Sequence, residues 1–152
     1  TLSPSSAASD VYKRQILSRV SRTLYEMGYV KETYEKALLE REEQYPTGIL
    51  ITENVSVALP HADVEHVNEE ALVIIKPRHK VPFRRMDEPS EETAVNLIFL
   101  LVIKDPKGYV KFLAKLTTMF KDKKFLEMIE KGNVEEVKKF IVEKGLLKLR
   151  QQ

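Results

Sequence analysis

The spacing of apolar residues along the chain changes from helical to extended and back to helical. Up to residue 44 apolar residues recur every three or four positions, which predicts two helices. Between residues 49 and 103 the pattern is alternating or continuously apolar, which predicts three or more strands. Beyond residue 105 the helical spacing returns and predicts three more helices. This order predicts an α+β fold, a three-layer α/β/α arrangement with a small mixed sheet between helices.

The two leading helices have clear stop signals. The first ends at Gly28, and the second is expected to begin after a Thr33 cap and to end before Pro46, because the residue before proline avoids the α region. The apolar face of the first helix is formed by Ile16, Val20, Leu24 and Met27.

The strands differ in pattern. Val55 to Leu59 alternates with small residues and is expected to end at Pro60, which cannot donate to a ladder. The run 95–103 is the most hydrophobic, so we expect a central strand buried on both faces. Shorter strands are expected at 49–51 and 71–75. The basic stretch 77–82 and the acidic stretch 87–92 are expected to be loops.

The C-terminal third shows three helix signatures. Asp122 can cap a short helix that Gly132 ends, and Asn133 with Glu136 forms a capping box for the last helix. The expected apolar faces are Val110, Leu113, Leu116, Thr117 and Phe120 in the first of these helices, and Val134, Val137, Phe140 and Ile141 in the last.

The first fifteen residues have a different character. Residues 5–15 resemble, at all eleven positions, a frame translation of a common transposon-based sequencing adaptor. We therefore expect residues 1–15 to be a non-native segment and residues 16–152 to form a single domain. The native chain would then begin upstream of Ile16.

Composition restricts the function classes. The 152 residues are 43% hydrophobic and 32% charged, with a formal net charge of +2, which gives no general attraction to nucleic acid or to anionic membranes. There is no cysteine, hence no disulfide, zinc-thiolate site or thiol nucleophile. No apolar run approaches the ~20 residues that span a bilayer, and no signal peptide opens the chain. A cytoplasmic location without membrane insertion is expected.

Candidate chemistry centres on few residues. Only His61, His66 and His79 titrate near neutrality without help, and His61 directly follows a proline-ended strand, at the rim of a sheet. Arg41 carries a planar fork that suits an anion, although periodicity alone cannot bring it to His61. The segment of His61, Asp63, Glu65 and His66 lacks the spacing of a metal site, so no metal is expected. A basic run, residues 76–85, is followed at once by acidic residues and does not predict nucleic-acid binding.

These residues lie within a longer motif. Arg41-Glu42, then Tyr45-Pro46-Thr47-Gly48-Ile49, then Val57-Ala58-Leu59-Pro60-His61 resembles the IIA component of the bacterial sugar phosphotransferase system, in its fructose–mannitol class. The resemblance extends over nearly everything from Gly28 onward. Within this class the chain is most similar to the galactitol-type branch, and one supporting detail is His66, five residues after His61.

The resemblance implies a function for each part of the motif. His61 would accept a phosphoryl group from the phosphocarrier HPr and pass it to a cysteine of a IIB component, which serves the membrane component IIC. Arg41 would stabilise the phosphoryl anion, with His66 and Thr47 as supporting residues and no cofactor. Such a site is expected to be shallow, with apolar surface nearby for its two partners. Residues 16–152 would then be one IIA-type phosphotransferase domain.

Two departures from the family pattern accompany the resemblance. Many mannitol and fructose members have a second histidine where this chain has Tyr109. The family's first strand should precede the first helix, and the adaptor-like segment stands in its place, so that strand is expected to be missing.

Two other functions remain open at this point. A regulatory IIA-like domain would use the same histidine for signalling, and neighbouring IIB and IIC genes would separate transport from that role. A metal hydrolase using His61, Asp63 and His66 is the remote alternative, which metal analysis would test.

Overall fold

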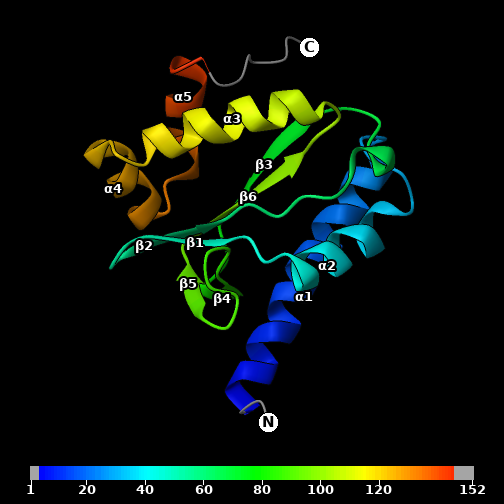
Figure 1. Cartoon of the computed structure of the whole chain (residues 1–152), viewed down its shortest axis with the longest axis horizontal. Helices are drawn as coiled ribbons and strands as arrows, with labels where there is room; N and C mark the ends of the chain where they lie inside the picture. Colours follow the sequence, from blue (N-terminus) through cyan, green and yellow to red (C-terminus); the bar gives the residue numbers. More distant parts are fainter. Residues whose placement is uncertain (1–3, 146–152) are drawn as a thin grey trace.

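The computed structural model describes residues 4–145. Over this range the chain forms five α-helices, one short 3₁₀ helix and six strands, with both flanking layers of helices visible in Figure 1. In chain order these are α1 Pro4–Glu26, α2 Tyr34–Gln44, β1 Gly48–Thr52, β2 Val55–Ala58, η1 Val64–His66, β3 Ala71–Ile75, β4 Val81–Arg84, β5 Glu92–Val95, β6 Leu97–Val102, α3 Pro106–Met119, α4 Lys123–Lys131 and α5 Val134–Glu143.

The main sheet is mixed, as predicted. Its strand order is β1-β2-β6-β3, with β2 and β6 parallel and the two outer pairs antiparallel. All six residues of β6 are buried, so the expectation of a central strand buried on both faces is confirmed. The predicted run 95–103 is nevertheless too long. Asn96 interrupts it, because its side-chain oxygen accepts from Ser56 N at 2.8 Å and its own N–H donates to Ser56 O at 2.8 Å.

Alternate residues of β6 face opposite helical layers, because side chains alternate across a strand. Leu97, Phe99 and Leu101 lie in the core formed with α3, α4 and α5. Leu100 and Val102 lie in the core formed with α1 and α2. Burying each of these large side chains contributes about 1.5–3 kcal/mol. The three-layer α/β/α prediction is therefore confirmed (Figure 1).

The basic and acidic stretches expected to be loops partly form a hairpin, which corrects that expectation. β4 and β5 pair antiparallel as a separate two-stranded sheet. Phe83 and Val95 alternate with more exposed neighbours and are fully buried against the main sheet. The dense charges around these short runs hide the period-two pattern in the sequence. Arg85 of the basic run pairs with Asp87 at 2.6 Å.

The residues predicted to begin and end the C-terminal helices do so. Asp122 accepts from the backbone N–H of Lys124 and Phe125 at the start of α4. Gly132 ends α4 with a φ of +68°, in the left-handed region that glycine adopts most easily. Asn133 then accepts from the backbone N–H of Glu136 and begins α5. Its own N–H donates to Met128 O and not to the Glu136 side chain, so the predicted capping box forms only in part.

The predicted helix faces and the Thr33 cap need correction. Met27 and Val110, both expected in the core, are 60% and 64% exposed, and Thr117, expected on the same face as Val110, is exposed as well. Met27 lies beyond the end of α1, in the turn at Gly28, and Leu17 is among the residues of α1 that are buried. Thr33 precedes α2 but makes no side-chain capping bond, because its hydroxyl pairs with His66 instead.

Helix α1 begins at Pro4, well before the expected start at Ile16, and so includes most of the adaptor-like segment. The Tyr12 ring meets the His79 ring edge-on with centroids 4.8 Å apart, and Tyr12 Oη accepts from Arg78 N. The origin of this segment and the missing first strand remain predictions.

None of the helices among residues 4–145 combines the length and the apolar character that a membrane span requires.

Candidate functional site

The strand register carries His61 to the rim of the sheet. Val57 pairs with Leu97 in the parallel ladder, and His61 makes an isolated parallel bridge to Leu101 with the same offset. Pro60 lies two residues beyond the end of β2 but keeps the register of that strand, since Leu101 N donates to Pro60 O at 3.0 Å. His61 therefore lies on the same face as Val57, toward α3, and is half-buried.

The ring nitrogens of His61 have different roles. Nδ1 lies 3.0 Å from the carbonyl oxygen of Leu59. A carbonyl can only accept, so Nδ1 carries the proton and donates it, which leaves Nε2 as a neutral, basic nitrogen. The backbone thus selects the tautomer whose Nε2 can act as a nucleophile.

Burial lowers the pKa of His61, and the nearby Arg41 charge lowers it further. The Leu59 hydrogen bond and the Asp63 carboxylate act in the opposite direction but do not reverse the shift. The unfolded chain would therefore bind a proton at this histidine at higher pH than the native protein does. Native stability consequently falls as pH drops through the interval between the ordinary and the lowered pKa.

We predict that His61 stays neutral below the ordinary histidine pKa of about 6.5. The physical reason is the loss of hydration on burial, which disfavours the imidazolium. An NMR pH titration of the ¹⁵N-labelled imidazole gives its midpoint directly. A His61 midpoint at or above the ordinary value would contradict this prediction.

Arg41 comes to the site from α2. Its Nη1 donates to Asp63 Oδ1 at 3.1 Å, and its guanidinium lies 5.4 Å from the centroid of the Tyr45 ring. Arg41 Nε is buried and has no acceptor among residues 4–145. Asp63 lies two residues beyond His61, and the Arg41 charge acts to lower the pKa of both His61 and Tyr109. The structure therefore brings Arg41 and His61 together, which periodicity could not do.

Tyr109 forms another side of the site. It belongs to the first turn of α3, which Asp105 caps, and its ring centroid is 4.7 Å from that of His61 at a tilt of 39°. Burial raises the pKa of the Tyr109 phenol, so its hydroxyl stays protonated at neutral pH. Position 109, where many family members have a second histidine, thus holds an aromatic ring that packs on His61.

Thr47 lies beneath the site and connects α2 to the His61 segment. Its hydroxyl donates to Glu42 Oε1 at 2.6 Å and accepts from Leu59 N at 3.2 Å. Its backbone N–H donates to Glu42 Oε2 at 2.9 Å. The supporting role that the resemblance gives to Thr47 therefore has a physical route to Leu59, the residue that holds His61 Nδ1.

Gly48 explains the last position of the Pro-Thr-Gly motif. A Cβ at this position would lie 2.7 Å from the backbone oxygen of Arg84 and 3.1 Å from the Phe83 side chain. Only glycine therefore lets β1 pass this close to β4 without displacing the backbone.

His66 makes its contacts at another place. Nδ1 lies 2.7 Å from the Thr33 hydroxyl at the start of α2, and Nε2 lies 3.6 Å from Glu65 Oε1. Asp63 accepts from Arg41, whereas His66 contacts Thr33, so the two side chains have separate partners. No group of three or more candidate metal ligands is found among residues 4–145.

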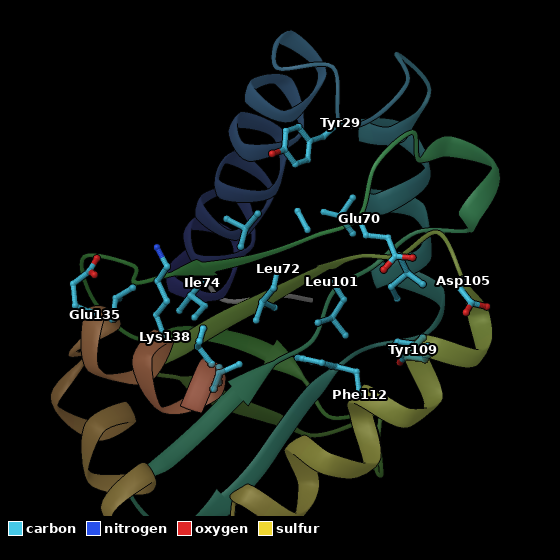
Figure 2. A pocket seen from close by; sticks show the side chains of 18 residues that line it. Tyr29, Glu70, Leu72, Ile74, Leu101, Asp105, Tyr109, Phe112, Glu135 and Lys138 are labelled. Atoms are coloured by element: carbon cyan, nitrogen blue, oxygen red, sulfur yellow. The ribbon is translucent and has the colours of Figure 1, made fainter. Parts of the chain in front are cut away.

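An apolar groove of about 1030 Å³ borders the site. It runs along β3 between α3 and α5, and Figure 2 shows Leu72, Leu101 and Phe112 lining it. Tyr109 and Leu101 belong both to this groove and to the surroundings of His61. Apolar surface beside His61, as expected from the sequence, is therefore present.

Sequence reasoning missed three residues of the site: Glu42, Asp63 and Tyr109. In the sequence, Glu42 stands out only as part of the Arg-Glu motif. No local sequence pattern indicates that a glutamate is buried beside a buried threonine. The sequence offers Asp63 as a metal ligand and its backbone N–H as a phosphoryl donor, but its acidic side chain, two positions after the histidine, is also a natural partner for Arg41. Tyr109 lies in the first turn after Asp105-Pro106, a helix start that could have been placed at the sheet rim.

The architecture is shared by solved IIA structures. The chain superposes on the IIA–phosphorylated IIB mannitol complex of Escherichia coli with a TM-score of 0.62, at 19% identity, covering 84% of this chain and 88% of that one. It superposes on the nitrogen regulatory protein IIA-Ntr of Neisseria meningitidis with a TM-score of 0.54, at 23% identity, covering 78% and 77%. The fold is therefore that of IIA domains.

Sequence comparison identifies the family. Residues 7–144 match the model of the phosphoenolpyruvate-dependent sugar phosphotransferase system, EIIA 2. The galactitol-specific EIIA component of Escherichia coli K12 is 30% identical over 108 residues, which cover 71% of this chain and 71% of that protein. The chain belongs to the EIIA 2 family and is a IIA-type phosphocarrier of the sugar phosphotransferase system.

Proposed function

We propose that His61 accepts the phosphoryl group on Nε2. The bond from phosphorus to the donor histidine of phospho-HPr breaks as the bond to His61 Nε2 forms, and the group later passes to a cysteine of a IIB component. The hydrogen bond from Nδ1 to Leu59 O carries this proposal, because it leaves Nε2 free at the sheet rim. Such transfer depends on positioning and charge stabilisation, since the protein supplies little covalent chemistry beyond the nucleophile.

Arg41 neutralises the charge that arrives. The transferred group carries about two negative charges, and a guanidinium is the side chain best suited to hold its oxygens. Arg41 Nη1 is held by Asp63 in the free protein, whereas Nε has no acceptor among the described residues. The backbone N–H groups of Ala62 and Asp63 are further candidate donors.

The physiological role we propose is uptake of a sugar or polyol similar to galactitol. The named relatives at 30% identity are galactitol-specific, whereas the regulatory IIA-Ntr structure shares the fold at 23% identity. HPr and a IIB component are then the direct partners in the cytoplasm, and the membrane component IIC is served through IIB. Incubation with phospho-HPr, followed by mass mapping of the modified residue, tests the carrier step.

His66 is proposed as a supporting residue near the phosphoryl group. Its contacts to Thr33 and Glu65 hold it in η1, five positions beyond His61. If it supports the phosphoryl group, its ring donates a hydrogen bond to a phosphoryl oxygen once His61 is phosphorylated. The ¹⁵N imidazole shifts of His66 in the free and phosphorylated protein measure this, and unchanged shifts with normal transfer in His66→Ala would remove His66 from the site.

We also propose that residues 1–15 are adaptor-derived. The match over residues 5–15 supports this, and independent reads of the source genome test it. The same codons found in place there would show the segment to be native.

A further inference from the structure

We propose that Glu42 is a positioning residue for His61, acting through Thr47 and the backbone of Leu59. The inference rests on the proposed role of His61 as the phosphoryl acceptor. It assigns to the second residue of the Arg-Glu motif a task distinct from that of Arg41.

The directions of the hydrogen bonds follow from the donors involved. Leu59 N–H can only donate, and it donates to the Thr47 hydroxyl oxygen at 3.2 Å and to Thr47 O at 3.3 Å. The Thr47 hydroxyl proton must then point elsewhere, and Glu42 Oε1 at 2.6 Å accepts it. Glu42 Oε2 accepts the Thr47 backbone N–H at 2.9 Å. Both oxygens of one carboxylate thus hold Thr47 in a single orientation.

Leu59 transmits this orientation to the imidazole. Its side chain is fully buried, its N–H is held by Thr47, and its carbonyl oxygen accepts from His61 Nδ1 at 3.0 Å. Pro60 follows, which restricts Leu59 to extended backbone. The position of the Leu59 carbonyl, and with it the His61 tautomer, therefore depends on the Thr47 contact.

Burying the carboxylate of Glu42 costs free energy unless hydrogen bonds or a nearby cation compensate for the lost hydration. Glu42 is 4% exposed, and none of the ion pairs found among residues 4–145 includes it. Burial raises the pKa of Glu42, and the two Thr47 hydrogen bonds, with weaker help from the charges of Lys13 and Arg84, oppose that shift only in part. A glutamine in its place has one acceptor oxygen and one amide donor, so it cannot accept both Thr47 donors.

The test compares Glu42→Gln with Glu43→Gln, the same chemical change one residue along. The Glu43 side chain is 73% exposed and forms an ion pair with Arg14 at 4.0 Å. We expect Glu42→Gln to slow transfer from saturating phospho-HPr about tenfold, at an unchanged half-saturating HPr concentration. In the unphosphorylated protein, ¹⁵N shifts of His61 should move toward a mixture of tautomers. Glu43→Gln should behave as wild type in both measurements.

A second pair of variants keeps the test decisive if Glu42→Gln does not fold. Thr47→Val keeps the shape but removes the hydroxyl, whereas Thr47→Ser restores it. We expect Thr47→Val to change the His61 ¹⁵N shifts and slow transfer, and Thr47→Ser to recover both. Wild-type His61 shifts in both Glu42→Gln and Thr47→Val, or in Thr47→Val alone if Glu42→Gln does not fold, would overturn the proposal. The ¹⁵N readout needs no phosphoryl transfer, so failure of HPr to label His61 would count against the proposed function alone.

Discussion

The His61→Ala variant is expected to accept no phosphoryl group from phospho-HPr and to keep the native fold. In the proposed transfer Nε2 of His61 is the nucleophile, and alanine offers none, so transfer should fall to background. The side chain is half-buried and packs on Tyr109, so its removal should cost only about 1 kcal/mol of unfolding free energy.

Mass mapping after incubation with phospho-HPr, together with a thermal unfolding curve, measures both parts of this prediction. His79→Ala is the matched control, since it removes an exposed imidazole whose ring contact is with Tyr12 in α1. Label on His66 or His79 in the His61→Ala protein, at the wild-type rate, would show that the acceptor is misassigned.

Continuous apolar runs and helix-capping residues predict the fold well, whereas short strands of mixed polarity do not. The predicted strand 71–75 coincides with β3, and Asp122, Gly132 and Asn133 end or begin helices as expected. The hairpin of β4 and β5 was missed, because each strand has only four residues, and its buried positions include the polar Thr93 while its exposed ones include Ala94. Its stability comes from packing on the main sheet, which no local window contains.

The site divides in the same way between local and long-range information. The rim position of His61 follows from the strand before it, and the motif resemblance pointed to Arg41. The pairing of Arg41 with Asp63 and the contact of Tyr109 with His61 each join segments that lie apart in the chain. Such contacts are set by how α2 and α3 pack on the sheet, and spacing along the sequence does not encode that geometry.

Replacing Arg41 by alanine is expected to slow phosphoryl transfer about a hundredfold, equivalent to roughly 3 kcal/mol of transition-state stabilisation. Arg41→Lys should also slow transfer, because lysine keeps the charge but loses the two-pronged geometry. The effect on stability should be small. The Arg41–Asp63 pair is partly exposed, with Asp63 67% exposed, and such a pair contributes about 1 kcal/mol or less.

Single-turnover transfer from phospho-HPr, measured beside the unfolding free energy, separates the catalytic loss from the structural one. Arg22→Ala is the matched control, because Arg22 also pairs with a carboxylate, Glu35, but on the opposite helical layer from Tyr109. The control should lose a similar small amount of stability and transfer at the wild-type rate. Wild-type transfer in Arg41→Ala would instead remove Arg41 from the site. Backbone N–H donors near His61 would then stabilise the phosphoryl charge, since the Asp63 carboxyl group has no positive charge to offer.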